Sequence, residues 1–321
     1  MIEKIRTFFP EKKLTNDELC SLFPEWAPDK IFQKTGIASR FIASPEQTAG
    51  DLAFGAAEEL FKTEDRSKVD FVILCTQTPD YFLPPTACLL QHRLNLPKHT
   101  GAFDMNLGCS GYIYALALSQ GLLQGGMANS ILLLNADTYT KLLAPDDKGT
   151  RAIFGDAGAA TLCSATSSNR LHSFIFGTDG NGASQLIMKS GAMRALCAPS
   201  KPESLYMNGP EVFNFTIQVV PALIRQILAK ANSTMDQIDY FVFHQANTFM
   251  LEHLRKKIGI PAEKFVLCVE EYGNTVSATI PIALEQMQRQ NQIKPGQKLL
   301  LAGFGVGLSW AGCVLEINQP L

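Results

Sequence analysis

The sequence has little charge and no excess of either sign. Of its 321 residues, 28 are Lys or Arg and 30 are Asp or Glu, so the formal net charge is −2. Nucleic-acid-binding domains usually carry a basic excess, and this balance argues against a nucleic-acid partner. Charged residues make up only 18% of the chain and apolar residues 46%, which excludes intrinsic disorder. The shortage of charge also suggests that much of the surface is buried, as in an oligomer.

Motifs for metal, nucleotide or disulfide chemistry are also missing. The eight cysteines form no C-x-x-C pair, and the sequence contains no HExxH, EF-hand or P-loop pattern. We therefore expect no zinc or calcium site and predict that no residue of the chain binds a metal. Residues 1–10 carry charges and no apolar run, unlike a signal peptide. Free thiols without such a signal predict a cytoplasmic protein in a reducing compartment.

Two uncharged stretches require a test for membrane spans. Residues 105–136 and 299–315 contain no Asp, Glu, Lys or Arg. A spanning helix needs about 20 predominantly apolar residues. A Gly-Gly pair and several amides interrupt the first stretch, and four glycines interrupt the second. We therefore predict that both are buried core elements and that the protein has no membrane partner.

An internal repeat organises the chain into two α/β units. The run 70–75 (DFVILC) resembles the run 239–244 (DYFVFH). Each run is followed by a polar string, a glycine turn, a helical segment and a second apolar strand. Duplication explains this order economically, although common apolar runs can resemble one another by chance. We predict an N-terminal half over 1–166 and a C-terminal half over 167–321, with helices over 111–124 and from Pro210 toward Ala231.

Cys109 is the candidate nucleophile among the thiols. Gly108 and Gly111 flank it, and the predicted helix 111–124 follows. Unpaired N–H groups and the positive end of the dipole at a helix N-terminus favour a thiolate. This context predicts that the pKa of Cys109 falls from about 8.5 to about 7–8. The alternative is a small core residue, which is the usual role of a free cysteine.

His244 and Asn274 are the candidate partners of Cys109. His244 ends a predicted strand, and sites form at strand ends in α/β sheets. Asn274 lies at a predicted helix start, in the place that Cys109 occupies in the first half. Halves packed about a pseudo-twofold axis would turn both helix starts toward one cavity. A structural histidine and a capping asparagine are the alternatives.

Taken together, the motifs resemble those of the ketoacyl synthase III family, the condensing enzymes that begin fatty-acid synthesis. The matching segments are 34–37, 104–112, 154–159, 244–247, 272–275 and 303–310, and they follow one another in the family order. The resemblance covers essentially the whole chain. It implies a thiolase-like α/β fold with five layers, αβαβα, built from two duplicated halves, and it implies a homodimer.

The resemblance also implies the chemistry, a decarboxylating Claisen condensation. Cys109 would take an acyl group from a thioester donor. His244 and Asn274 would bind a malonyl thioester on acyl carrier protein and stabilise the enolate left by loss of carbon dioxide. Each well-placed donor of this kind is worth about 3–4 kcal/mol. The backbone N–H groups of Cys109 and Val306 would hold the second oxyanion, and the reaction needs no metal or redox cofactor.

Pocket and docking residues follow from the same resemblance. Leu83, Phe154 and Phe304 fall at positions that line the acyl pocket, with Leu83 closing the pocket of the partner subunit. A basic cluster on a predicted helix suits an acidic carrier protein, although a solvated helix face would look the same. This cluster consists of Arg255, Lys256 and Lys257.

The chain departs from the family at the positions that bind coenzyme A. Lys30 and Lys148 stand where family members flank adenine with tryptophan and arginine, and Phe249 stands where arginine is common. The acyl donor is therefore left open between a carrier-protein thioester and coenzyme A held differently. Val306 replaces a glycine that is common in the turn, which predicts a narrower cavity.

Three rival functions share these residues. An acyltransferase on the same scaffold would pass the acyl group from Cys109 to an alcohol, an amine or a non-malonyl carbon acid, with His244 as general base. A hydrolase of the Cys-His-Asn type is disfavoured because Cys109 lies mid-chain within a repeated unit. A scaffold subunit with a vestigial site is the non-enzymatic alternative, and retention of Cys109, His244 and Asn274 argues against it.

Overall fold

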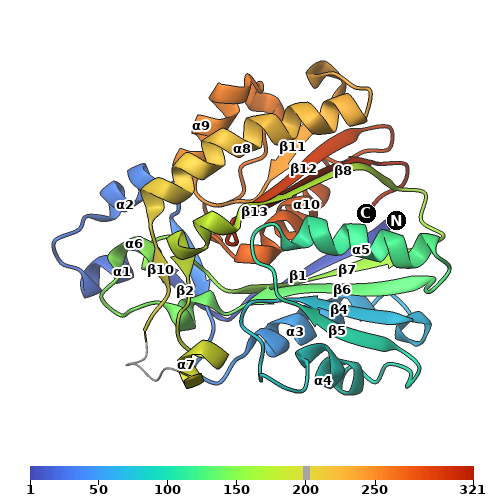
Figure 1. Cartoon of the computed structure of the whole chain (residues 1–321), viewed down its shortest axis with the longest axis horizontal. Coiled ribbons are helices and arrows are strands. Elements are labelled where there is room, and N and C mark those ends of the chain that lie inside the picture. Colours follow the sequence, from blue (N-terminus) through green and yellow to red (C-terminus); the bar gives the residue numbers. More distant parts are fainter. Residues whose placement is uncertain (198–202) are drawn as a thin grey trace.

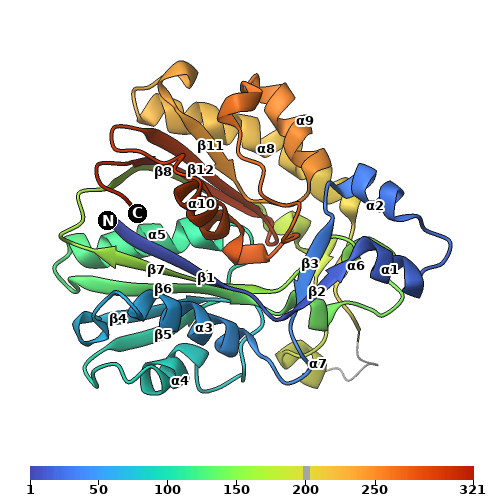
Figure 2. The same cartoon turned by 180° about the vertical axis from the view of Figure 1, so that it is seen from behind.

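Two β-sheets alternate with three layers of helices in a computed structural model that describes residues 1–197 and 203–321. In Figures 1 and 2 the sheets lie one above the other, with one helical layer between them and one on each outer face. The arrangement confirms the predicted five-layer αβαβα fold built from two similar halves. The outer helices are α3 (Ala49–Phe61) and α4 (Thr86–Arg93) on one side and α8 (Gly209–Lys230) and α9 (Thr248–Ile258) on the other; α5 (Gly111–Gln124) and α10 (Thr279–Arg289) lie between the sheets.

The first sheet is built entirely from residues before 165. Its strand order is β1-β7-β6-β4-β5, and β4 runs parallel to both β5 and β6. The strands β1 and β7 continue the sheet in antiparallel fashion. The bounds are β1 (Ile2–Phe8), β4 (Phe71–Cys75), β5 (Gly101–Met105), β6 (Ser130–Asp137) and β7 (Ala157–Ser164). Parallel strands buried on both faces are continuous apolar runs, as β4 and β6 are.

The second sheet is built from residues after 169. Its order is β11-β12-β13-β8, with β11 parallel to β12 and the other pairs antiparallel. Its strands are β8 (Arg170–Thr178), β11 (Tyr240–Phe243), β12 (Lys298–Gly305) and β13 (Ser309–Glu316). The repeat noticed in the sequence thus corresponds to β4 and β11, which occupy matching places in the two sheets. The proposed seam at 166/167 lies between β7 and β8.

The helix α5 is apolar on nearly every side because it lies between the two sheets. It begins and ends at the predicted residues, 111 and 124. Its first residue must be small, since a Cβ on Gly111 would lie 2.3 Å from Sγ of Cys75 at the end of β4. This close approach fixes the start of α5 against the first sheet, directly after Cys109.

A smaller lobe covers one end of the two sheets, as the left side of Figure 1 shows. It contains two two-stranded sheets, β2–β3 and β9–β10, and short helices from both halves. Its elements are β2 (Lys12–Thr15), α1 (Asn16–Leu22), α2 (Pro28–Thr35), β3 (Ser39–Ile42), α6 (Lys148–Arg151), β9 (Leu186–Ile187), α7 (Met193–Cys197) and β10 (Tyr206–Met207).

One described helix, α8, is long and apolar enough to cross a membrane by length and composition. It begins at Gly209, one residue before the predicted start, with Asn208 as its N-cap. Its apolar side packs on β8, β12 and β13 and belongs to the main core cluster. This packing is that of an outer-layer core helix.

Candidate active site

Cys109 lies in the turn that joins β5 to α5 and is 7% exposed. The glycine-rich turn between β12 and β13 closes over it from the other half of the chain. A Cβ on Gly305 would lie 2.8 Å from Cβ of Cys109 and 2.9 Å from Sγ, and a Cβ on Gly303 would lie 2.7 Å from the Cys109 carbonyl oxygen. Only glycine fits at these two positions. The glycines of the turn therefore allow the backbone of the second half to lie directly against Cys109.

The pKa of the Cys109 thiol is raised, contrary to the expectation from its helix-start position. Burial is the largest cause and the Asp137 carboxylate adds to it, so that the pKa reaches about 12. The N–H groups of Val306 and of Cys109 itself act in the opposite direction. The sequence argument considered only the helix dipole, whose effect is smaller than the cost of a buried anion. Cys109 therefore rests as a neutral thiol.

His244 directly follows β11 and is buried beside the start of α10. Its Nδ1 lies 2.7 Å from Oγ1 of Thr279, the first residue of α10. Burial lowers the pKa of His244 to about 3, and the Val276 carbonyl opposes this shift. The ring of Phe304 meets the imidazole edge-on at 5.8 Å. His244 is therefore neutral at physiological pH and can offer one N–H to a ligand.

Asn274 lies in a turn and not at a helix start, which corrects the sequence-based expectation. The helix α10 begins five residues later, after the short 3-10 turn 276–278. The Asn274 N–H donates to Ile153 O at 2.8 Å, and Oδ1 accepts from the N–H of Val276 at 2.9 Å. With Oδ1 occupied, Nδ2 has no hydrogen-bond partner within residues 1–197 and 203–321. It is a free donor beside the buried cluster that contains Cys109.

One buried apolar cluster connects the surroundings of Cys109, His244 and Asn274. Cys109, Phe154, Val276 and Phe304 belong to one buried cluster, which links the α5 start, the Asn274 turn and the end of β12. Phe304 contacts His244, and residue 154 pairs with Asn274 through a backbone bridge. The structure thus brings Cys109, His244 and Asn274 around one region between the halves.

Asp137 is a polar residue of this region that the sequence analysis missed. Its carboxylate ends β6, is fully buried, and accepts hydrogen bonds from the N–H of Gln77 and from the hydroxyls of Thr76 and Ser277. Burial raises the pKa of Asp137 to about 7 despite these donors. Ser277 belongs to the Asn274 turn, so Asp137 ties the two halves together beside Cys109. A polar pair at 135 and 137, directly after the apolar run 131–134, is the signal that could have identified it.

An apolar cleft opens beside the site. It has a volume of about 1040 Å³ and reaches Val306 and Gly307 of the glycine-rich turn. Tyr139 lies in its wall, donates to Gln77 Oε1 at 2.6 Å, and packs against Phe154 at 5.2 Å between ring centroids. Its other apolar walls come from Leu142, Leu186, Ile187, Met188 and Leu205. Such a cleft suits an acyl chain.

Leu83, Phe154 and Phe304, the residues expected in the acyl pocket, are not among those that line this cleft, and the expected docking residues lie on α9. Leu83 is 80% exposed and does not line the cleft of its own chain. Arg255 is largely covered and paired with Glu252 at 2.8 Å, whereas the side chain of Lys256 is 71% exposed. Lys257 is exposed as well. Glu252 pairs with both Arg255 and Lys256, the latter at 4.0 Å, so one carboxylate offsets part of the positive charge of this cluster.

Two of the three positions that depart from the family, Lys148 and Phe249, make other contacts. Lys148 forms an ion pair with Glu25, and its Nζ lies 5.6 Å from the centre of the Phe23 ring. Lys30 is exposed on α2, and Phe249 is exposed on α9, where it packs on Phe213.

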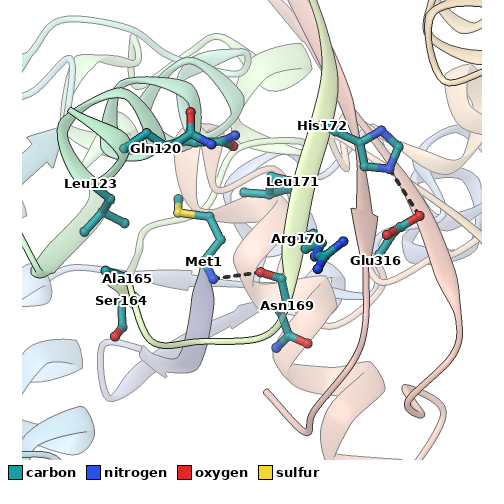
Figure 3. A pocket seen from close by; sticks show the side chains of 11 residues that line it. Met1, Gln120, Leu123, Ser164, Ala165, Asn169, Arg170, Leu171, His172 and Glu316 are labelled. Carbon is teal, nitrogen blue, oxygen red and sulfur yellow. Dashed lines mark hydrogen bonds and ion pairs between the residues drawn. The ribbon is translucent and has the colours of Figure 1, made fainter. Parts of the chain in front are cut away.

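A second pocket lies at the seam between the halves and includes the C-terminal end of α5, whereas Cys109 precedes the N-terminal end of that helix. It has a volume of about 660 Å³, and polar side chains such as Gln120, Asn169 and His172 line it together with apolar ones (Figure 3). The pair formed by His172 and Glu316 at 3.4 Å crosses its wall. It is smaller than the cleft beside Cys109, and none of the candidate catalytic residues lines it.

Comparison with known proteins agrees with this geometry. Profiles of the family described as 3-oxoacyl-[acyl-carrier-protein (ACP)] synthase III match residues 103–180, and its C-terminal profile matches residues 228–317. A beta-ketoacyl-[acyl-carrier-protein] synthase III 2 from Halalkalibacterium halodurans is 35% identical over 327 residues, covering 99% of this chain and 97% of that protein.

Solved structures give the same result. A 3-oxoacyl-(acyl-carrier-protein) synthase III crystal structure superposes with a TM-score of 0.95 and 50% identity, covering 98% of this chain and 99% of that one. The 3-oxoacyl-(acyl carrier protein) synthase III of Pseudomonas aeruginosa superposes with a TM-score of 0.92 and 31% identity, covering 100% and 98%.

Proposed function

The chain belongs to the 3-oxoacyl-[acyl-carrier-protein] synthase III family of condensing acyltransferases, and we propose that Cys109, His244 and Asn274 carry out its reaction. The observation that supports this proposal best is the free Nδ2 of Asn274 and the neutral ring of His244 beside the cluster around Cys109. Two neutral donors and one thiol are what a decarboxylating condensation requires.

The first half-reaction transfers an acyl group to Cys109. The sulfur attacks the carbonyl of an acyl thioester, the bond to the donor thiol breaks, and that thiol leaves with the proton that Cys109 gives up. The tetrahedral oxyanion lies against the N–H groups of Cys109 and Val306, which already face the sulfur. Because the thiol is neutral at rest, deprotonation belongs to the activated step and is not complete beforehand.

The second half-reaction condenses the acyl group with a malonyl thioester. Loss of carbon dioxide leaves an electron pair that spreads onto the thioester oxygen. His244 and Asn274 donate hydrogen bonds to that oxygen, in a buried region where such bonds are strong. The carbon of the enolate then attacks the carbonyl on Cys109, the sulfur–acyl bond breaks, and a 3-oxoacyl thioester leaves.

The charges and contacts of residues on and near α9 indicate which carriers bring the acyl and malonyl groups. We propose that the malonyl group arrives on acyl carrier protein and that Lys256 and Lys257 attract its acidic surface. Arg255 contributes through its pair with Glu252, which holds the side chain along the helix. The exposed Phe249 and the engaged Lys148 favour a donor bound through its carrier protein over one held by adenine stacking.

We further propose a homodimer in the cytoplasm. The strand β5 is at the edge of the first sheet, with a hydrogen-bonded neighbour on one side only. The helix α4 packs beside it, and the segment before α4 exposes Tyr81, Phe82 and Leu83. An exposed edge strand flanked by apolar side chains is a pairing surface. Pairing two copies there would bring Leu83 of each chain toward the acyl cleft of its partner.

Intact-protein mass spectrometry tests the proposed function. The protein is incubated with acyl-coenzyme A and acyl carrier protein donors of several chain lengths, and the product with malonyl carrier protein is then identified. We expect a mass gain of one acyl group at Cys109, no gain in Cys109→Ala, and a 3-oxoacyl product. A label that persists in Cys109→Ala would refute the assignment of the nucleophile, and an acylated protein without a 3-oxoacyl product would favour transfer to another acceptor.

A further inference from the structure

A buried carboxyl group lies between the loop that carries the thiol and the turn that carries the amide. Asp137 ends β6 and is fully buried. Its Oδ1 accepts hydrogen bonds from the N–H of Gln77 at 2.8 Å and from the Thr76 hydroxyl at 3.3 Å. Its Oδ2 accepts from the Ser277 hydroxyl at 2.8 Å. Gln77 follows β4 of the first sheet and Ser277 precedes α10, so the two oxygens bind segments distant in sequence.

We propose that Asp137 is a positioning residue that holds the loop of Cys109 with one carboxyl oxygen and the turn of Asn274 with the other. The inference rests on the proposed function, in which Cys109 and Asn274 act in successive half-reactions. It deepens that function by naming the group that sets their relative position. Within the part of the chain that the structure describes, Asp137 forms no hydrogen bond with either residue and so acts through its neighbours.

The contact at Oδ1 leads to the loop that carries Cys109. Asp137 fixes the N–H of Gln77, and Oε1 of the Gln77 side chain accepts from the Tyr139 hydroxyl at 2.6 Å. That side chain lies directly on Gly108, because a Cβ added to Gly108 would overlap Oε1 of Gln77. Gly108 precedes the nucleophile, so the position of Gln77 limits where the backbone of Cys109 can lie.

The contact at Oδ2 leads to the side chain of Asn274. Ser277 follows Val276, whose N–H holds Oδ1 of Asn274 at 2.9 Å. The backbone of Asn274 is held separately, since its N–H donates to Ile153 O and its carbonyl accepts from the N–H of Gly155. Loss of the Ser277 contact should therefore displace the amide of Asn274 without releasing the turn that carries it.

The connection does not require a negative charge on the carboxyl group. In Asp137→Asn the amide oxygen can replace Oδ1, and the amide N–H can donate to the Ser277 oxygen. The Ser277 hydroxyl then donates to the carbonyl oxygen of Cys75, which lies 3.3 Å away. We therefore expect Asp137→Asn to retain both half-reactions. Asp137→Leu keeps the branched shape but accepts no hydrogen bond, and it should slow both.

The alternative is that Asp137 only stabilises the fold. The two roles differ in how a change divides between the half-reactions. General loosening slows both, whereas removal of the Oδ2 contact alone should slow only the step that needs Asn274. Ser277→Ala removes that contact and leaves those at Oδ1 in place. Ser119→Ala is the matched control, because it removes another buried serine hydroxyl, from within α5.

The test measures acylation of Cys109 by intact mass and release of carbon dioxide from malonyl carrier protein, with folding checked by circular dichroism. We expect Ser277→Ala to acylate at the wild-type rate and to release carbon dioxide roughly 10²-fold more slowly, the cost of a misplacement of about 1 Å. In the Asn274→Ala background the same change should cost nothing further, because the side chain that it positions is gone. Ser119→Ala should change neither rate.

Each outcome bears on one proposal. The role of Asp137 would be overturned by wild-type release of carbon dioxide in Ser277→Ala, by equal slowing of both half-reactions in that variant, or by a further loss in the Asn274→Ala background. Loss of both half-reactions in Asp137→Asn would also overturn it. Ser277→Ala decides the question alone where Asp137→Leu does not fold. A wild type that acylates but never releases carbon dioxide, or an Asn274→Ala variant with full release, would instead overturn the proposed function.

Discussion

Adding one methyl group to the turn over Cys109 should disable the nucleophile without unfolding the protein. In Gly305→Ala the new Cβ would lie 2.9 Å from Sγ of Cys109 and 2.8 Å from its Cβ. Nonbonded heavy atoms are most stable about 3.5–4.0 Å apart, so the sulfur or the turn must move by about 0.6–1.1 Å. Overpacking of this kind costs about 1–3 kcal/mol of stability. A displacement of about 1 Å at a reacting atom costs roughly 10²-fold in rate.

The assay is the rate of acyl addition to Cys109, followed by intact mass, alongside urea denaturation. We expect Gly305→Ala to remain folded and to acylate roughly 10²-fold more slowly than the wild type. Gly180→Ala is the control, because an added Cβ there meets nothing within 4 Å and the residue is exposed. A Gly305→Ala protein that acylates at the wild-type rate would show that the turn does not constrain the sulfur, and the reasoning from close approach would fail.

Three further predictions concern the donors, the buried carboxylate and the assembly. His244→Ala and Asn274→Ala should still accept an acyl group but lose release of carbon dioxide from malonyl carrier protein; unchanged release in either variant would remove that residue from the mechanism. Because burial raises the pKa of Asp137 to about 7, the folded state binds this proton more tightly than the unfolded chain. Its contribution to stability, up to about 4 kcal/mol, is therefore present below pH 4 and lost as the pH rises toward 7. Urea denaturation of the wild type and Asp137→Asn at pH 5 and 8 should reveal this as a difference in slope, and parallel pH profiles would contradict it. Light scattering should give a mass twice 35.1 kDa, and Leu83→Asp should lower it; a wild-type monomer would rule out the dimer.

The two duplicated α/β halves were predictable from the residues, because they show in local composition and in the order of segments along the chain, whereas the five-layer arrangement followed only from the resemblance to a known family. The apolar runs of β4 and β6 and the evenly apolar α5 indicated elements covered on both faces, and the similarity of 70–75 to 239–244 indicated duplicated halves. These features require only local composition and order along the chain. The start and end of α5 were placed correctly for the same reason.

The electrostatics of the site could not be predicted in this way. The pKa of Cys109 depends on how deeply the β12–β13 turn buries it and on Asp137, and both come from residues distant in sequence. The position of Asn274 was misplaced because Thr275 and its neighbours resemble a helix start, whereas Val276 takes a left-handed conformation that interrupts the chain before α10. The contact between Thr279 and His244 joins residues 35 positions apart, and no motif spacing reveals it.

The raised pKa of Cys109 has a consequence for the chemical durability of the protein. Oxidants and alkylating reagents attack the thiolate, so a buried neutral thiol is a poor target for them. Cys88 and Cys197 are exposed, whereas Cys109 is covered by the glycine-rich turn. Iodoacetamide at neutral pH should therefore modify the surface thiols first and leave the nucleophile intact. Cys109 would lose its proton and react only when a thioester occupies the cavity. In the resting enzyme the neutral thiol is therefore protected from oxidants.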